Sequence, residues 1–109
     1  MSASKYRVEL TRDAERDLVG IARYIAEYRS IEQARYVLGN LRGVVNKQAM
    51  FPKRGALPAE LLALGIREYR QVFFKPYRVI YRVFGKRVIV MLIADGRRDM
   101  VTVLAERLL

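Results

Sequence analysis

Residues 77–94, which read YRVIYRVFGKRVIVMLIA, decide the fold class of this chain. Between Tyr77 and Val83, large apolar residues alternate with residues that include Arg78 and Arg82, which is the period of a strand with two different faces. Gly85-Lys86 supplies a tight turn. Residues 88–94 are apolar throughout, which is typical of a central strand covered on both faces. The stretch therefore predicts a β-hairpin in the middle of a sheet.

The residues before this hairpin predict one strand and two helices. Residues 5–10 alternate as a strand does, and Thr11 can cap a helix over residues 12–27, where apolar residues recur at helical spacing. Ser30 and Gln33 fit a capping box, which starts a second helix that we expect to end near Ala49. Because only a few residues join the two helices, we expect them to pack as an antiparallel hairpin.

The remaining segments complete one small domain. Residues 51–65 have loop chemistry with a short helical turn at 58–64, residues 66–74 predict a strand that ends at Lys75-Pro76, and residues 99–108 predict a C-terminal helix. The order is β-α-α-β-β-β-α. It predicts a single α+β domain over residues 1–109, with a helical hairpin packed on a small, curved, mainly antiparallel sheet.

Composition excludes several classes of protein. The chain has 109 residues, of which 52% are hydrophobic, so it is not a disordered segment. No apolar run approaches the roughly 18 residues of a membrane span, and the N-terminus has no secretory pattern, so we expect a cytoplasmic protein that does not bind membranes. Cysteine and histidine are both absent, which removes the thiolate nucleophile and the commonest general base and metal ligand. We expect no metal site and no cofactor.

The charge of the chain indicates an anionic partner. There are 21 Lys and Arg against 11 Asp and Glu, a formal net charge of +10. Most of these cations are Arg, which suits bidentate contacts with phosphate or carboxylate groups. The partner is expected to be nucleic acid or an acidic protein surface.

Several motifs, taken in order, carry a resemblance to a known family. They are Tyr6-Arg7-Val8 running into Thr11-x-Asp13-Ala14-x-x-Asp17-Leu18, then Ile21 and Tyr24, the Phe51-Pro52 helix exit, Ile66-Arg67-Glu68-Tyr69-Arg70, Tyr77 to Val83, Val88 to Ile93, and Arg97-Arg98. This set resembles the RelE/ParE superfamily of toxins from bacterial type II toxin–antitoxin systems. The likeness covers nearly the whole chain.

The resemblance implies one of two activities. RelE-like members are ribosome-dependent mRNA endonucleases that use basic strand residues and often a C-terminal Tyr or His. ParE-like members inhibit DNA gyrase without nuclease chemistry. Arg78 and Arg98 match arginine positions of the RelE-like branch, but the position of its C-terminal Tyr falls on Leu104, and its strand lysines fall near Tyr69 and Gln71. The resemblance is therefore closest to the ParE branch.

Cleavage of RNA also needs a base and an acid, and the residues offer few candidates. Asp95 and Asp99, which flank Arg97-Arg98, are the only bases that we would name, and charge pairing or helix capping is their more ordinary role. An mRNA endonuclease remains the alternative function. A plain nucleic-acid-binding module and an inactive relative that only titrates antitoxin also stay open.

We expect the binding residues to be cations and an apolar edge, with no catalytic residue among them. The cations are Arg67, Arg70, Arg78, Arg82, Arg97 and Arg98, and the apolar edge is Leu104 and Leu108. Each group has a simpler explanation: Arg78 and Arg82 can lie on a solvated sheet face, and the two leucines can dock onto the domain's own core. Tyr24 and Tyr28 are expected to cover the helical hairpin.

These observations lead to one hypothesis. The chain is a ParE-type toxin, not an enzyme, whose target is DNA gyrase and whose action blocks replication. A cognate ParD-like antitoxin neutralises it in a toxin–antitoxin hetero-oligomer. Direct binding of nucleic acid is a secondary expectation.

Overall fold

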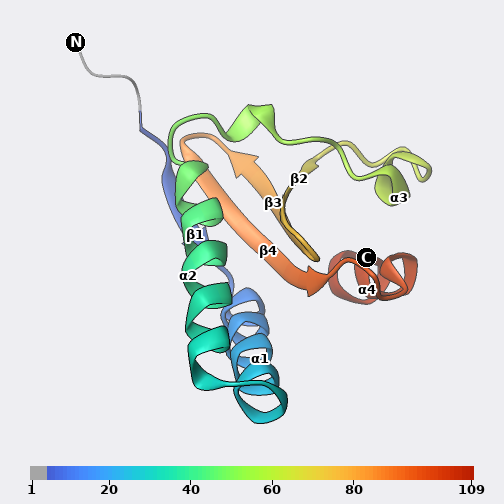
Figure 1. The fold of residues 1–109 in the computed structure, drawn as a ribbon. Helices are drawn as coiled ribbons and strands as arrows, with labels where there is room; N and C mark the ends of the chain where they lie inside the picture. Colours follow the sequence, from blue (N-terminus) through green and yellow to red (C-terminus); the bar gives the residue numbers. More distant parts are fainter. Residues whose placement is uncertain (1–4) are drawn as a thin grey trace.

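The computed structural model describes residues 5–109, which form a four-stranded sheet with helices on both faces (Figure 1). The strands are β1 (Arg7–Leu10), β2 (Tyr69–Phe74), β3 (Tyr77–Phe84) and β4 (Arg87–Asp95). The helices are α1 (Arg12–Tyr28), α2 (Ile31–Lys47), the short 3₁₀ helix η1 (Pro52–Arg54), α3 (Ala59–Leu62) and α4 (Met100–Leu108).

The sheet has the strand order β1-β4-β3-β2. The pairs β2–β3 and β3–β4 are antiparallel, and β1 lies parallel to β4. β4 therefore has a neighbour on each side, which confirms the prediction of a central strand from its unbroken apolar run. The parallel pairing of β1 was not predicted. It arises because the helical hairpin returns the chain to the end of the molecule where β1 started.

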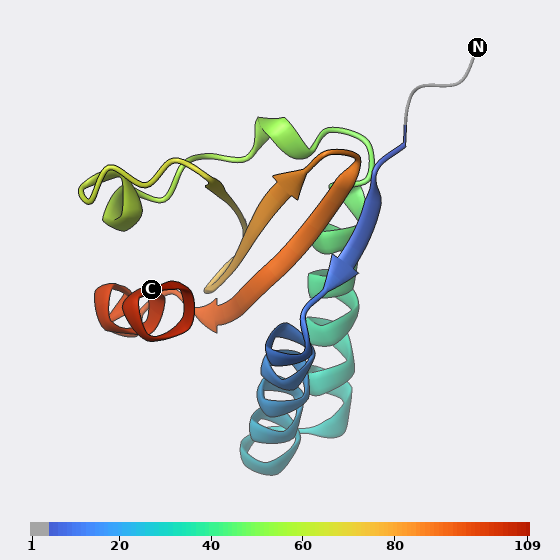
Figure 2. The same ribbon diagram turned by 180° about the vertical axis from the view of Figure 1, so that it is seen from behind.

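The α1–α2 hairpin covers one face of the sheet, here called the hairpin face. Figure 2 shows the two helices side by side against β1 and β4. Both helices begin where the sequence predicted, because the Thr11 hydroxyl accepts a hydrogen bond from the Ala14 N–H and the Ser30 hydroxyl accepts one from the Gln33 N–H, each at 3.0 Å. The buried core on this face consists of Ala14, Leu18, Ile25, Ala34, Val37, Leu41, Val45, Val79, Tyr81, Val88, Val90 and Ile93.

The opposite face of the sheet, here called the far face, carries a second and smaller core. Leu61 from α3 and Leu104 from α4 pack there against Ile80 and Leu92 of the two inner strands. A β-bulge between Ile80 and Tyr81 shifts the register of β3 against β4. Ile80 and Arg78 share this face because they alternate with Val79, which lies in the first core.

The predicted order of elements is confirmed with small differences at the ends. Strand β2 begins at Tyr69 and not at Ile66. Residues 66–68 connect α3 to the sheet without pairing to β3. Helix α2 ends at Lys47, two residues before the predicted end. The 3₁₀ turn at Pro52–Arg54 was predicted only as loop.

Candidate functional site

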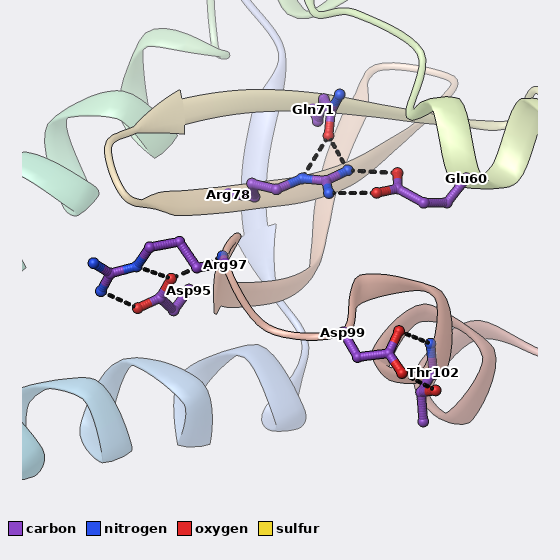
Figure 3. A network of polar contacts seen from close by, with 7 residues as sticks. All are labelled: Glu60, Gln71, Arg78, Asp95, Arg97, Asp99 and Thr102. Carbon is purple, nitrogen blue, oxygen red and sulfur yellow. Dashed lines mark hydrogen bonds and ion pairs between the residues drawn. The ribbon is translucent and has the colours of Figure 1, made fainter.

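Arg78 forms the centre of a polar network on the far face of the sheet (Figure 3). Its NH1 and NH2 groups donate to Glu60 Oε2 and Oε1 at 2.8 and 2.9 Å, and its Nε donates to Gln71 Oε1 at 2.9 Å. Gln71 lies on the neighbouring strand, whereas Glu60 comes from α3. Gly96 leaves room for the stem of Arg78, because a Cβ there would lie only 2.7 Å from Arg78 Cδ.

The network removes Arg78 from the surface. The residue is 8% exposed, and Nε, NH1 and NH2 all have partners. A buried guanidinium is tolerated because the carboxylate neutralises it. The same pairing, through the hydrogen bonds from Arg78, holds the pKa of Glu60 below its ordinary value.

Both sequence interpretations of Arg78 therefore need correction. One made it a contact cation for a partner and the other made it a solvated strand residue, and each required an exposed side chain. The structure instead uses Arg78 to tie α3 to the sheet. The sequence could not reveal this, because Glu60 is eighteen residues away and lies in a segment that the sequence predicts as a loop with a helical turn.

Arg97 and Arg98 follow the end of β4, and their surroundings differ. Arg97 donates to both oxygens of Asp95, from Nε at 3.0 Å and from NH2 at 2.6 Å, while its side chain stays 77% exposed. These hydrogen bonds hold the pKa of Asp95 below its ordinary value. Arg98 is exposed, and its side chain has no hydrogen bond or ion pair to any of residues 5–109.

Asp99 caps helix α4. Its Oδ2 accepts a hydrogen bond from the Thr102 hydroxyl at 2.7 Å and its Oδ1 accepts a longer one from the Thr102 N–H at 3.4 Å. The bonds from Thr102 lower the pKa of Asp99. Both carboxylates that the sequence offered as bases, Asp95 and Asp99, thus have the ordinary structural roles of ion pairing and capping.

The other predicted cations lie toward the opposite end of β3. Arg82 pairs in register with Tyr69 at the start of β2, and its guanidinium lies 5.4 Å from the Phe84 ring centroid. Arg70 is half-buried and donates from NH1 to the Gly55 carbonyl at 2.8 Å. Arg67 is exposed. The six arginines therefore do not form one strip, because Arg78, Arg97 and Arg98 gather near the β2–β3 turn and the other three lie away from it.

The two C-terminal leucines pack on the domain itself. Leu104 is 1% exposed within the far-face core, and Leu108 is half-buried against it. The prediction that Leu104 presents an apolar edge to a partner is therefore wrong, and the alternative of docking onto the chain's own core is confirmed.

A groove that the sequence did not reveal lies between the α1–α2 hairpin and the β2–β3 turn. Its volume is about 830 Å³. Four aromatic rings, four cations and two carboxylates are among the residues that line it: Tyr24, Tyr36, Phe74, Tyr77, Arg29, Lys75, Arg97, Arg98, Asp17 and Asp95. These residues come from four separate segments, so no local pattern could have grouped them.

The rings of the hairpin supply the apolar part of this groove. Tyr24 is 63% exposed and Tyr28 is 66% exposed, so the expectation that they cover the hairpin is wrong. Their rings lie 4.8 Å apart, and of the two only Tyr24 lines the groove. The sequence did carry a signal for Tyr24 alone, because this residue falls outside the buried positions Ala14, Leu18 and Ile25 of α1.

Metal and membrane sites receive no support from the described residues. No group of three or more Asp or Glu among residues 5–109 is arranged to hold a metal ion. Across the same residues, every helix is too short or too polar to cross a bilayer.

Comparison with known proteins identifies the family. A sequence model of the ParE toxin family of type II toxin–antitoxin systems, parDE, matches residues 8–100. The chain belongs to the ParE toxin family. Toxin ParE3 of Caulobacter vibrioides is 29% identical to it over 101 residues, which cover 93% of this chain and 97% of that protein. The ParE family assignment confirms the resemblance to the RelE/ParE superfamily.

Solved structures of the superfamily share the fold. The chromosomal ParDE toxin–antitoxin system of P. aeruginosa contains a chain that matches with a TM-score of 0.72 and 21% identity, over 85% of this chain and 98% of that one. The toxin–antitoxin complex RelBE2 of Mycobacterium tuberculosis matches with a TM-score of 0.62 and 16% identity, over 86% and 94%. A mutant of E. coli toxin RelE in the free state matches with a TM-score of 0.62 and 12% identity, over 96% and 99%.

Proposed function

We propose that this ParE-family chain inhibits DNA gyrase, blocks replication and is neutralised by a cognate ParD-like antitoxin. It acts in the bacterial cytoplasm by binding and not by catalysis. The family match over residues 8–100 and the likeness to Toxin ParE3 support this proposal. A net charge of +10 speeds the approach to a complex that carries DNA.

One structural observation carries the choice of binding over mRNA cleavage. The arginine that matches the nuclease branch, Arg78, is buried in its pair with Glu60, and the candidate bases Asp95 and Asp99 are engaged by Arg97 and Thr102. Internal attack by a ribose hydroxyl requires a general base whose pKa is high enough to take up the proton. The hydrogen bonds from Arg97 and Thr102 lower the pKa of Asp95 and Asp99, which makes both carboxylates weaker bases.

The groove beside the hairpin is the place that best fits the antitoxin. Its rings suit the apolar side of an amphipathic segment, and its cations suit acidic residues on the same segment. Arg98 is well placed for such a contact because its side chain has no ion-pair partner within residues 5–109.

A supercoiling assay tests the proposal. Gyrase acts on relaxed plasmid with excess purified toxin, with and without antitoxin. We expect inhibition that the antitoxin reverses. The Arg98→Gln variant should lose part of its response to antitoxin, while Arg23→Gln, a matched change on the outer side of the hairpin, should behave as wild type.

Undisturbed gyrase turnover at excess toxin would overturn the proposal. Cleavage of mRNA on translating ribosomes would then assign the RelE-type activity, with Asp95→Asn and Asp99→Asn as the first variants to test.

A further inference from the structure

Three segments that are distant in sequence meet at the end of the molecule where the β3–β4 turn lies. The Tyr6 N–H donates to the Ala49 carbonyl and the Arg7 N–H donates to the Lys86 carbonyl, each at 2.8 Å. Figure 1 shows η1, the β3–β4 turn and the start of β1 together at this end. Residues 5–10, 47–56 and 82–90 are called the basic pole here. They contain eight Lys and Arg residues and a single carboxylate, Glu9.

At the basic pole, aromatic rings hold cations in place. All three cation–ring contacts found among residues 5–109 occur here. They are Arg54 over Phe51 at 4.1 Å from the ring centroid, Arg82 over Phe84 at 5.4 Å, and Lys86 over Tyr6 at 4.6 Å.

A ring and a carboxylate have different effects on a cation. A carboxylate orders a guanidinium and also neutralises it, as Glu60 does for Arg78 and Asp95 does for Arg97. A ring restricts the side chain through its quadrupole but leaves the full positive charge in place. Ring-held cations therefore lose less rotamer freedom on binding a partner, and they keep all their charge for it.

We propose that the basic pole binds the phosphodiester backbone of DNA without reading its sequence. Arg87 pairs with Glu9 at 2.8 Å, and no other Lys or Arg of the basic pole has an ion pair within residues 5–109. A backbone of closely spaced phosphates complements such unpaired cations. Phe51 is 53% exposed and Phe84 is 58% exposed, so their rings are also available to stack on unpaired bases. η1 is a three-residue helix, and the rest of the pole is strand ends, a helix end and loops, so the pole presents no helix to enter a major groove.

An acidic protein segment is the competing partner, and the position of the groove argues against it. The groove lies beside the β2–β3 turn and the end of β4, whereas the basic pole lies at the β3–β4 turn. The antitoxin and DNA thus have separate places on the chain. The inference extends the proposed function, because DNA is what gyrase holds, but its test uses toxin and DNA alone.

The test compares two triple variants that remove the same charge. One is Arg54→Gln, Arg82→Gln and Lys86→Gln at the basic pole. The control is Arg12→Gln, Arg23→Gln and Arg35→Gln, three exposed residues of the hairpin. Fluorescence anisotropy measures the affinity for a labelled duplex and for a labelled single strand over a range of salt concentrations.

At low salt, we expect the pole variant to bind DNA about ten-fold more weakly than wild type, or weaker still. The affinity of the control variant should stay within about two-fold of wild type. The slope of log affinity against log salt should become shallower by about 0.9 for each lost duplex contact, or about 0.7 for each single-strand contact. The proposal is supported whether the wild type binds the duplex or the single strand more tightly. The tighter of the two probes identifies the form of DNA that the basic pole prefers.

Equal losses in the two variants would overturn the proposal, since binding would then follow net charge alone. Absence of salt-dependent binding by the wild type would also overturn it. So would a pole variant that binds DNA normally but has lost its affinity for antitoxin, because the pole would then serve an acidic protein. Unfolding midpoints of both variants exclude misfolding as the cause.

Discussion

Arg78 and Glu60 join β3 to α3 through two parallel hydrogen bonds, NH1 to Oε2 at 2.8 Å and NH2 to Oε1 at 2.9 Å. Parallel bonds of this kind are among the strongest side-chain interactions, because both groups are charged and their planes match. The pair ties α3 to the far face of the sheet and leaves Arg78 buried. Its main effect is thus on the stability of the fold.

Replacing Arg78 should destabilise the protein. Arg78→Met leaves Glu60 without its partner, and breaking a buried pair costs about 3–5 kcal/mol. Because the Glu60 side chain keeps 25% exposure to solvent, we expect a loss of about 2–3 kcal/mol in the free energy of unfolding, measured by urea denaturation. Arg82→Met, on the same strand face but without a carboxylate partner, should lose less than about 1 kcal/mol. Equal losses would contradict a special role for the pair.

The same pair makes stability depend on pH in the acidic range. The pKa of Glu60 is lowered in the folded state by the hydrogen bonds from Arg78, below the ordinary value of 4.5. The unfolded chain therefore binds its proton first, so this contribution is fully present above pH 4.5 and is lost as the pH falls through the folded pKa. The free energy of unfolding, measured between neutral and acidic pH, should fall less steeply for Glu60→Gln than for wild type. Glu27→Gln, on the exposed side of α1, is the control and should retain the wild-type slope.

Two glycine substitutions should change stability in opposite directions. A Cβ on Gly55 would collide with the hydroxyl of buried Tyr81 and lie 3.0 Å from the Gln71 carbonyl, so Gly55→Ala should cost about 1–3 kcal/mol. A Cβ on Gly43 would meet nothing within 4 Å in the interior of α2, so Gly43→Ala should stabilise the protein by about 0.5–1 kcal/mol. Thermal unfolding of both variants measures the difference. If Gly55→Ala raised the unfolding temperature, the space between Gly55 and the Tyr81 hydroxyl would be large enough for a Cβ, and this account would be contradicted.

Asp17 should be more important for stability than its neighbour Asp13. Its oxygens accept two hydrogen bonds from Arg107 of α4, at 2.8 and 2.9 Å, and one from the Ile93 N–H at 2.9 Å. Asp17→Ala should therefore cost about 2–3 kcal/mol, because it leaves the Ile93 N–H without a partner and the half-buried guanidinium of Arg107 with only the Met91 carbonyl. Asp13→Ala removes an exposed pair with Arg16 at 3.9 Å and should cost less than about 1 kcal/mol. The unfolding midpoints of both variants are measured by denaturant titration. Equal midpoints for Asp17→Ala and Asp13→Ala would contradict this account.

Tyr24 and Tyr28 form a matched pair for testing the groove. Both are exposed on α1, and replacing either one removes the same ring contact, but only Tyr24 lines the groove. If the antitoxin occupies the groove, Tyr24→Ala should weaken antitoxin binding by about ten-fold or more, as the loss of an aromatic anchor does. Tyr28→Ala should stay within about two-fold in a calorimetric titration. A larger loss for Tyr28→Ala would place the antitoxin on the outer side of the hairpin.

The elements of this fold were predictable because their signals are local. Thr11 and Ser30 cap helices whose apolar residues recur at helical spacing, and each cap needs only the next three residues. The unbroken apolar run of β4 predicted a strand with a neighbour on each side, and the register confirms it. The parallel pairing of β1 with β4 was not predictable in the same way, since it joins residues about eighty positions apart.

The site was predicted less well, since its partners are not local. The alternation of β3 placed Arg78 and Arg82 on one face, which is correct, but it could not show that α3 brings Glu60 to Arg78 and leaves Arg82 beside a ring. Leu104 is likewise an apolar position on an amphipathic helix, and only the position of α4 decides that its own sheet covers it. The spacing of apolar and polar residues predicts which face of a strand or helix a side chain occupies. The contacts of that side chain depend on which other segment of the chain packs over the face.

The α+β class, the order of the elements, the family resemblance and the net charge of +10 all follow from the amino-acid sequence. These properties depend on residue types and on short periods along the chain. The distribution of that charge depends on the tertiary structure. Carboxylates neutralise Arg78, Arg87, Arg97 and Arg107, and aromatic rings hold three cations at the basic pole. The reason is that ion pairs and cation–ring contacts act over a few ångströms, and folding sets these distances between segments that the sequence keeps far apart.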